Sequence, residues 1–482
     1  MADSKSKSER KRPWRENIEA LTMAIGVALV FKVFFLEISK IPSGSMQPTL
    51  MGDPGSETFD RIAVDKLSYH FRDPERWEIV VFKHPLERSR VMVKRLVGMP
   101  DEELKIEHGD LWTRASDEEP WTQLRRPQDV QRRMWKSLEP RELKKSRWRA
   151  LDTEDWRIQS EGIKALGPGS ARYERAAGGV VLDVYTDGYP DELRPEVQGG
   201  GARHEVGDLR LTGEVVPSAE ATAIAIELSE GELRYVFHLP GPAANAEERA
   251  RIEVRSRNQT APLAVHEAEG ALELVAEEAI SFDVQNLDDR LSLRIDGEEL
   301  VAAEVDPVAQ QTSSIVLRLE GGSAEFQDLM PYRDVYYYDP HPTRPKPWTA
   351  TIPSEHYVML GDNTQDSADG RDWSYTSFRW DQGDGERSEK GNFRGSGNFG
   401  GVVDLSANPI PIRFPDGAAG ELFRDEWGDR HWLRESEITA RRLDRDGVPM
   451  PLVPRGLMMG RAFAVFWPLQ PTRGLWRLGW LR

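Results

Sequence analysis

The sequence contains no cysteine. This absence excludes disulfide bonds, thiolate metal ligands and a cysteine nucleophile. Basic residues are also in the minority, with 64 Lys and Arg against 81 Asp and Glu and a net charge of −17. A general nucleic-acid-binding protein presents a basic surface, so we expect no nucleic-acid partner. The nine histidines stand in no recognisable triad motif, so a general base has to be sought among other side chains.

Long apolar runs are scarce, and the clearest one lies near the N-terminus. Ala20–Leu36 has Lys32 as its only charged residue, and it follows a segment with more basic than acidic side chains, residues 1–17. A helix that spans a membrane needs about 17–25 mostly apolar residues. We therefore predict a basic cytoplasmic tail over 1–17, a transmembrane helix over 18–38 and an extracytoplasmic remainder. The alternatives are a cleaved signal peptide and a buried helix of a globular domain.

The rest of the chain is predicted to be mainly β. Its 482 residues correspond to roughly three domains, and a hydrophobic share of 39% with 15 Trp suffices for a sizeable core. Short β-like runs separated by Gly, Pro and charged residues occur at 61–64, 78–82 and 91–97. The segment from about 105 to 175 is rich in Arg, Glu and Trp, and we predict a surface excursion with some helix there.

Several short apolar runs between about 178 and 330 predict an all-β sandwich. The predicted strands are 209–215, 223–228, 233–239, 272–275, 280–284, 291–295 and 315–319. Asp296-Gly297 predicts a hairpin, because both central residues of a type I′ turn need positive φ. The stretch 286–300 resembles the laminin-G-like or concanavalin-like sandwiches. Such a module could be a spacer or could bind a sugar or a protein, and we favour no ligand because a fold does not imply a function.

The C-terminal third returns to strand-like sequence in two places. Residues 352–373 contain strand-like runs and a turn rich in Gly, Asp and Asn, and a last strand is predicted over 460–467. Between them, 374–450 is rich in Gly, Asp and Arg, and we predict that loops dominate it. The final tail holds Trp476 and Trp480, which could lie at a membrane interface or dock on the protein surface.

A short segment after the apolar run carries candidate chemistry. Ile41–Leu50 places Ser43 and Ser45 in a turn that two prolines and a glycine constrain. A serine is a weak nucleophile until a neighbouring base takes its proton. Because no histidine is indicated as that base, a lysine is the remaining candidate.

Lys94 is the lysine that the pattern favours. It alternates with Met92 and Leu96, so we expect it to share their inward face, whereas Arg95 is expected to face solvent. An apolar environment lowers the pKa of a lysine amine, which turns it into a base near neutral pH. The alternative is an ordinary lysine at a sheet edge.

Four segments in one order resemble the bacterial type I signal peptidases, or leader peptidases, which are serine proteases with a Ser/Lys dyad. They are Pro-Ser-Gly-Ser-Met-x-Pro-Thr-Leu within 41–50, the Lys94 strand, Gly361-Asp362-Asn363 with Ser-Ala-Asp-Gly-Arg at 367–371, and Gly460-Arg461-Ala462. The matching segments are roughly 38–104, 350–373 and 453–470. The common Gly-Asp after Gly-x-Pro is replaced by Asp101-Glu102, which lies outside the dyad.

The resemblance implies a role for each matching residue. Ser45 would attack the scissile carbonyl, and Lys94 would be the general base. The Ser43 hydroxyl and the Ser45 N–H would form the oxyanion hole. The supporting residues would be Ser367, which orients the lysine amine, and the ion pair Asp369 and Arg371. The substrate pockets would be lined by Ile41, Met46 and Val93.

The resemblance also implies the domain plan. The expected regions are a basic tail (1–17), a transmembrane helix (18–38), a first catalytic-core segment that holds Ser45 and Lys94 (39–104), a charged, Trp-rich insertion (105–177), an inserted sandwich (178–332), a second catalytic-core segment (333–373), a second insertion (374–450) and a last core strand with the C-terminal tail (451–482).

The implied activity is that of a membrane-anchored endopeptidase that removes signal peptides from exported preproteins after small residues of the Ala-x-Ala type. Its expected partners are preproteins and the lipid bilayer of the inner (plasma) membrane, and no cofactor or metal ion is expected. The alternative is a catalytically silent homologue that acts as an extracytoplasmic binding module through its sandwich. A self-cleaving repressor-type protease would instead carry a DNA-binding domain, which does not fit this sequence.

Overall fold

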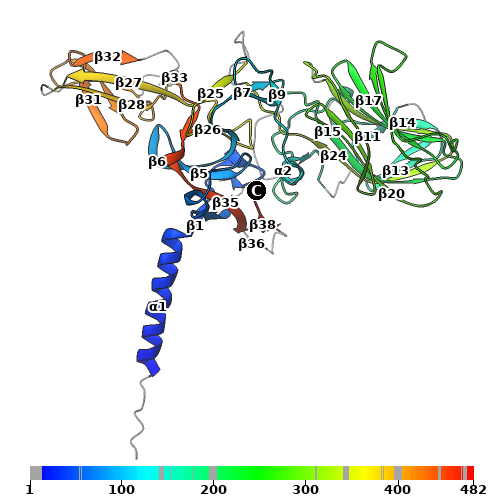
Figure 1. Ribbon diagram of the computed structural model, residues 1–482, viewed down its shortest axis with the longest axis horizontal. Coiled ribbons are helices and arrows are strands. Elements are labelled where there is room, and N and C mark those ends of the chain that lie inside the picture. Colours follow the sequence, from blue (N-terminus) through cyan, green and yellow to red (C-terminus); the bar gives the residue numbers. More distant parts are fainter. Residues whose placement is uncertain are drawn as a thin grey trace, which may run out of the picture.

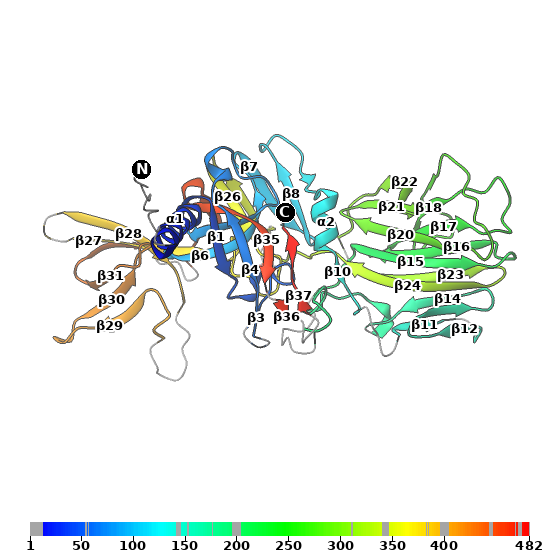
Figure 2. The ribbon, with the colours of Figure 1, turned by 90° about the horizontal axis from the view of Figure 1, so that it is seen from below.

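The protein is mainly β, with a long N-terminal helix that stands apart from a three-lobed body (Figure 1). The computed structural model describes residues 13–481 apart from 54, 56, 141–145, 152, 153, 176, 195–203, 310, 311, 340–346, 382, 384, 396–403, 443–446, 468 and 471–474. A central lobe lies between a small β lobe and a larger sandwich, as the view from below also shows (Figure 2). The predicted mainly β class is confirmed.

The helix α1 (Pro13–Phe34) contains most of the predicted membrane segment. Its described apolar side chains, such as Leu21 and Met23, are more than half exposed. Among the described residues, no helix is both long enough and apolar enough to cross a membrane. Residues 1–12, which hold most of the predicted basic tail, lie outside the described residues.

The C-terminal boundary predicted for the membrane segment is wrong. The chain leaves the helix after Phe34, and β1 (Leu36–Lys40) pairs antiparallel with β4 (Arg61–Asp65). Residues 36–38 therefore belong to the body. The polar residues Glu37, Ser39 and Lys40 lie in this strand, where their backbone groups are paired with a neighbour.

One antiparallel sheet forms the base of the central lobe. Its strands, in spatial order, are β1, β4, β35 (Met458–Trp467), β5 (Ile79–His84), β6 (Glu87–Gly98), β26 (His356–Leu360) and β34 (Leu452–Pro454), and β38 (Gly479–Trp480) pairs with β35. Strands from both ends of the chain therefore meet beside β5 and β6.

Both faces of this sheet are buried at β5. Val80 and Phe82 pack into one apolar cluster, and Ile79 and Val81 pack into another. Successive side chains of a strand point to opposite faces, so a continuous apolar run is what a strand covered on both faces requires. This double cover also limits what the neighbouring strand β6 can expose to water.

A second, smaller sheet and a helix extend the central lobe. The sheet has the order β25 (Thr349–Ile352), β7 (Glu102–Glu107), β8 (Asp110–Arg114) and β9 (Thr122–Gln123), and α2 (Gln128–Met134) follows it. Side chains of β7, β8, α2 and β25 share one apolar cluster. The beginning of the predicted 105–177 excursion therefore belongs to the packed core.

The large lobe is a sandwich of two antiparallel sheets around one continuous apolar core. One sheet has the order β12 (Trp156–Ile158), β13 (Gly162–Ala165), β24 (Ala324–Arg333), β15 (Leu209–Pro217), β20 (Ile280–Leu287), β21 (Arg290–Ile295) and β22 (Glu298–Glu304), with β10 (Lys136–Ser137) beside β24. The other has the order β11 (Trp148–Ala150), β14 (Gly169–Tyr173), β23 (Ser313–Glu320), β16 (Ala223–Glu230), β17 (Leu233–Pro240), β18 (Arg251–Ser256) and β19 (Ala264–Glu267).

The sandwich differs from the prediction in two places. Its strands begin with the two-residue β10 at Lys136 and continue from Trp148, rather than beginning at residue 178, because these strands of two to five residues are too short to give a periodic signal. The predicted strand 272–275 is wrong, since this stretch pairs with none of the described strands and instead places Leu274 on the core. The hairpin prediction is confirmed, because Asp296 and Gly297 have φ of 50° and 86° between β21 and β22.

The small lobe is built from the second insertion, and the prediction that loops dominate residues 374–450 is wrong. One sheet contains β28 (Glu386–Asn392), β27 (Ser374–Asp381), β32 (Ile438–Arg442) and β33 (Val448–Pro449), and another contains β29 (Ile410–Arg413), β30 (Ala419–Arg424) and β31 (Arg430–Arg434). Its described core is a cluster of four buried side chains, Phe378, Trp380, Phe423 and Leu433. Because these apolar positions are so few, the polar composition around them gave no strand pattern in the sequence.

Candidate active site

The turn that carries Ser45 is anchored by apolar side chains on either side of it. Ser45 lies in a 3₁₀ turn, η1 (Gly44–Met46), and is half-buried. Ile41 and Met46 are buried in the cluster beneath the central sheet. A Cβ on Gly52 would lie 2.4 Å from the Ser43 carbonyl oxygen, so only a glycine allows the chain to pass this close behind the turn.

Gly361 joins the Ser45 turn to the strand next to Lys94. Leu360, the last residue of β26, pairs with Arg95 of β6, so in this antiparallel register Gly361 follows at the level of Lys94. A Cβ on Gly361 would lie 2.2 Å from Ser367 Oγ and 2.4 Å from the Ser45 carbonyl oxygen. Two predicted site residues, Ser45 and Ser367, therefore meet at this glycine, and the backbone register places the glycine level with Lys94.

A hydrogen-bond pair fixes the same junction. The Asn363 backbone N–H donates to the Ser45 carbonyl at 3.2 Å, and the Asn363 Nδ2 donates to the Gly44 carbonyl at 2.9 Å. The two bonds hold the turn that follows β26 against the turn that carries Ser45. Asn363 therefore positions the Ser45 turn in addition to forming part of its own turn.

Lys94 points inward, as its alternation with Met92 and Leu96 predicted, and is only 1% exposed. Burial lowers the pKa of its amine to about 8, although the carboxylate of Asp369 acts in the opposite direction. An amine with this pKa is substantially neutral just above neutral pH and can accept a proton.

Ser367, Asp369 and Arg371 form one buried network. The Ser367 hydroxyl donates to Asp369 Oδ2 at 2.8 Å, and the Gly361 N–H donates to the same oxygen at 2.9 Å. Arg371 donates to both carboxylate oxygens, from Nε at 2.9 Å and from Nη2 at 2.8 Å. Burial is the largest single influence on Asp369 and opposes its ionisation, but Arg371, Lys94 and the Gly361 N–H together lower the pKa of the carboxyl.

Arg95 does not face solvent, which corrects its predicted orientation. It is 2% exposed and donates to Asp362 from Nε at 2.7 Å and from Nη2 at 2.6 Å. Asp362 also accepts from Thr49 Oγ1 at 2.6 Å, so this ion pair ties the end of the Ser45 segment to the turn after β26. The alternation rule failed because both faces of the sheet are buried here.

The chain between the two predicted catalytic-core segments, residues 105–332, contacts the site through residues that the sequence did not single out. Tyr189 Oη donates to Gln47 Oε1 at 2.6 Å, and Tyr185 Oη lies 3.3 Å from the same atom and from Asp366 Oδ2. Lys136 Nζ donates to the Asp362 carbonyl at 3.1 Å, and burial lowers its pKa to about 8. No local motif marks these positions, because their partners lie far away in sequence.

The C-terminal tail also contributes a clamp. Arg477 donates to Asp60 from Nε and Nη2, both at 2.7 Å, and to the backbone carbonyls of Pro48 and Thr49 at 3.2 and 3.1 Å. Trp480 stacks on Phe463 and keeps most of its surface exposed.

The predicted pocket residues have different exposures. Ile41 and Met46 are buried, Val93 is partly exposed and packs on the same cluster, and Ser43 is exposed. Val93 is therefore the one of the three predicted pocket residues that is partly exposed, and Ser43, predicted for the oxyanion hole, is exposed as well.

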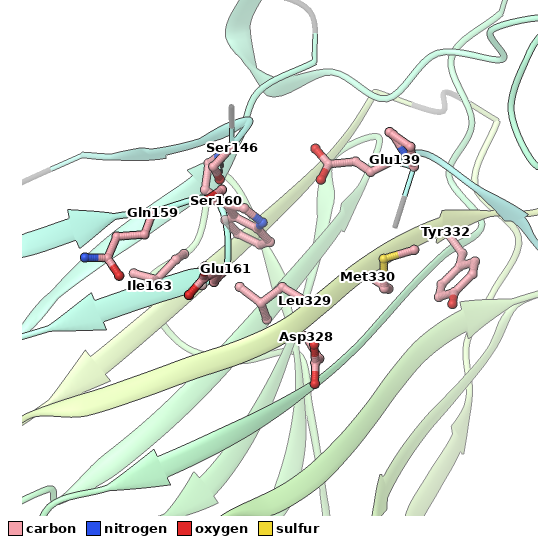
Figure 3. A pocket seen from close by; sticks show the side chains of 13 residues that line it. Glu139, Ser146, Gln159, Ser160, Glu161, Ile163, Asp328, Leu329, Met330 and Tyr332 are labelled. Carbon is pink, nitrogen blue, oxygen red and sulfur yellow. Dashed lines mark hydrogen bonds between the residues drawn. The ribbon is translucent and has the colours of Figure 1, made fainter. Parts of the chain in front are cut away.

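A separate pocket of about 600 Å³ lies on the sandwich (Figure 3). Glu139, Gln159, Glu161, Met330 and Tyr332 are among its lining residues, and no predicted site residue is. It is therefore distinct from the junction around Gly361.

Comparison with known proteins supports the predicted resemblance. The family model described as "Signal peptidase, peptidase S26" matches residues 14–155. A probable signal peptidase I-2 of Synechocystis sp. is 33% identical over 114 residues, which are 22% of this chain and 49% of that protein. The signal peptidase I of Leptolyngbya laminosa is 35% identical over 112 residues, 22% of this chain and 52% of that protein. The resemblance to type I signal peptidases is confirmed, and the chain spans about half the length of these relatives.

Solved structures show distant likeness. The carbohydrate binding module CBM66 from Bacillus subtilis is 10% identical, with a TM-score of 0.26, over 39% of this chain and 97% of that one. A Bacillus licheniformis beta-glucanase is 8% identical, with a TM-score of 0.28, over 41% of this chain and 98% of that one. At these values the likeness says nothing about what the sandwich binds.

Proposed function

We propose that this protein is a serine endopeptidase that removes signal peptides from exported preproteins, with Ser45 as nucleophile and Lys94 as general base. The observation that supports it most is the junction at Gly361. The Ser45 turn and Ser367 lie against this glycine, which follows β26 at the register level of Lys94, and burial lowers the pKa of Lys94 to about 8. The similarity of the N-terminal third to signal peptidases points to the same chemistry.

The reaction would proceed through an acyl-enzyme. Ser45 Oγ attacks the scissile carbonyl carbon while the neutral Lys94 amine takes the hydroxyl proton. The tetrahedral intermediate collapses, the carbon–nitrogen bond breaks, and the ammonium of Lys94 returns the proton to the leaving amine. Lys94, neutral again, then deprotonates the water that hydrolyses the ester, and the proton goes back to Ser45 as the acid product leaves.

Charge on the substrate oxygen has to be stabilised in both halves of the reaction. The Ser45 N–H and the exposed Ser43 hydroxyl would donate to this oxyanion. In serine proteases one such donor lowers the activation barrier by about 3–4 kcal/mol. Ser43 precedes the 3₁₀ turn in an extended conformation, so the two donors lie on consecutive stretches of one turn.

Ser367 would orient the base. Its hydroxyl proton is directed to Asp369, which leaves the oxygen lone pairs to accept an N–H from Lys94. That bond would turn the amine lone pair toward Ser45. The ion pair of Asp369 with Arg371 would hold Ser367 in this orientation.

The substrate class follows from the resemblance. Small residues such as Ala, one and three positions before the cut, would occupy shallow apolar pockets near Ile41, Met46 and Val93. The buried Ile41 and Met46 would form the floor, and the partly exposed Val93 would form a wall.

A membrane location belongs to the proposal. The exposed apolar side chains of α1 and the exposed Leu478 and Trp480 are surfaces that a bilayer and its interface would cover. α1 ends directly before β1, and only a few residues separate β1 from the Ser45 turn, so an anchored α1 would hold the nucleophile near the membrane surface of the extracytoplasmic side.

The test uses the full-length protein in detergent and a preprotein whose signal ends in Ala-x-Ala. The variants Ser45→Ala and Lys94→Ala are expected to lose processing by at least about a thousandfold. Lys83→Ala, which removes an exposed lysine from the adjacent strand β5, is the matched control and should retain activity. Equal processing by all four proteins would refute the Ser45/Lys94 assignment.

A further inference from the structure

Three aspartates from separate segments meet between the central lobe and the sandwich. Asp110 begins β8, Asp208 directly precedes β15, and Asp288 lies in the turn between β20 and β21. One oxygen from each carboxylate lies within 4.8 Å of the other two. Asp110 belongs to the smaller sheet that extends the central lobe, and Asp208 and Asp288 belong to the sandwich.

The neighbouring arginines are engaged elsewhere. Arg126 pairs with Asp334, and Arg125 pairs with Glu304 while its Nη2 donates to the backbone carbonyl of Asp288. Within the portion of the chain that the structure describes, none of the three clustered carboxylates has an ion-pair partner within 4.0 Å. Gln123 Nε2 donates to Asp110 at 3.1 Å, and the Asp288 N–H donates to Asp208 at 3.2 Å, so only neutral donors serve two of them.

Asp288 supplies the observation that points to a ligand. Its side chain is 3% exposed, and its Oδ2 atom has no hydrogen-bond partner among the residues that the structure describes. The adjacent Asp289 is 7% exposed, and its Oδ2 atom likewise has no hydrogen-bond partner in the described part of the chain. A buried carboxylate oxygen without a donor is unfavourable unless a proton or a cation compensates its charge.

We propose that Asp110, Asp208 and Asp288 bind a hard divalent cation of the size of Ca²⁺. Ca²⁺ takes six to eight oxygen ligands at about 2.3–2.6 Å, so two ligands on opposite sides of the ion lie about 4.6–5.2 Å apart. Three carboxylate oxygens within 4.8 Å of one another fit around one such ion. Their second oxygens and water can complete the shell.

The electrostatics of the cluster agree with this assignment. Burial, reinforced by the neighbouring carboxylates, raises the pKa of both Asp110 and Asp208 well above the usual range. Burial also raises the pKa of Asp288, to about 7. A divalent cation relieves the same repulsion without protons, and the partial exposure of Asp110 leaves a route for the ion to enter.

Occupancy would join two lobes. Asp110 lies on a short sheet that also contains β7 and β25, whereas Asp208 and Asp288 lie at the ends of sandwich strands, Asp208 before β15 and Asp288 after β20. An ion bound by all three would fix the sandwich against the central lobe. The cation would then have a structural role separate from the junction at Gly361.

The experiment titrates chelator-treated full-length protein with CaCl₂ by isothermal titration calorimetry. One ion per chain is expected, and the double variant Asp208→Asn/Asp288→Asn should bind at least about a hundredfold more weakly. The control Asp328→Asn removes an exposed carboxylate of the same sandwich, and its affinity should match that of the unaltered protein. A second titration with MgCl₂ should give a clearly lower affinity.

Thermal unfolding gives an independent readout. Saturating Ca²⁺, at about 100 times Kd, should raise the Tm of the unaltered protein by about 5 °C or more and leave that of the double variant unchanged. In chelator, the double variant should unfold at or above the Tm of the unaltered protein, because it has lost mutual repulsion. If the double variant fails to fold by circular dichroism, Asp110→Asn takes its place. Absence of Ca²⁺ binding, or equal binding by the variants, would overturn the proposal, and equal affinity for Mg²⁺ would overturn the assignment of ion size.

Discussion

Arg95 and Asp362 form a bidentate ion pair in the interior, with Nε–Oδ1 at 2.7 Å and Nη2–Oδ2 at 2.6 Å. The arginine lies on the strand of Lys94, and the aspartate lies two residues beyond the end of β26. Asp362 in turn holds Thr49. The strand of Lys94 and the segment that carries Ser45 are thus connected through a buried charge pair.

This pair leads to a prediction for stability. Asp362→Asn leaves the Arg95 charge buried without its counter-charge, and we expect the free energy of unfolding to fall by about 3–5 kcal/mol. Chemical denaturation followed by tryptophan fluorescence measures the change. Glu37→Gln, which removes one partner of the partly exposed Lys66–Glu37 pair in the same sheet, should cost at most about 1 kcal/mol. Equal losses from the two variants would contradict the structural role of Arg95–Asp362.

The pH dependence of processing should report the ionisation of Lys94. Burial lowers its pKa to about 8, and in the proposed role of general base Lys94 would be active only when neutral. Below this pKa the protonated fraction cannot accept the Ser45 proton, so kcat/KM should fall about tenfold per pH unit as the pH decreases. Above it, kcat/KM should reach a plateau.

Lys136 provides the control for that profile. It is a second buried lysine whose pKa is lowered to about 8, but it donates to a backbone carbonyl. In Lys136→Met the rise of kcat/KM with pH, the ascending limb of the profile, should therefore stay at the same pH, whatever the change in absolute rate. Disappearance of the limb in this variant would transfer the titration from Lys94 to Lys136.

The sequence predicted best where one local rule decides the structure. Asp296-Gly297 was identified as a hairpin turn because few residue pairs accept two positive φ values, and both adopt them. Lys94 was predicted to be buried from its apolar alternation partners, and it is. The specific string around Ser45 also identified the resemblance that the family match confirms.

The sequence failed where a distant partner decides the structure. Arg95 was assigned to solvent, yet its counter-charge lies 267 residues away in the sequence. The strands β11 to β14 and the small lobe escaped notice because short strands with few apolar positions acquire their stability only from neighbours remote in sequence. Tyr185 and Tyr189 were missed for the same reason, since their contacts with Gln47 arise only in the folded chain.

Gly361 should tolerate no side chain. A Cβ there would lie 2.2 Å from Ser367 Oγ and 2.4 Å from the Ser45 carbonyl oxygen, distances that force the serine turn to move. A misplacement of about 1 Å can cost a hundredfold in rate, so Gly361→Ala is expected to lower kcat by about that factor. Gly456→Ala, where nothing lies within 4 Å of the added carbon, is the matched control. Full activity in Gly361→Ala would show that the junction is not where catalysis occurs.

The two charges of the Asp369–Arg371 pair should move the ascending limb in opposite directions. The carboxylate of Asp369 raises the pKa of Lys94, and the guanidinium of Arg371 lowers it. In Asp369→Asn the ammonium loses a stabilising neighbour, so the midpoint of the limb should shift to lower pH. In Arg371→Gln the ammonium loses a repelling neighbour, so the midpoint should shift to higher pH. Each of the two shifts should be about half a pH unit or more. A purely structural role for the pair would lower the rate in both variants and leave the midpoint in place, so the sign of the two shifts separates electrostatic tuning of Lys94 from support of the fold.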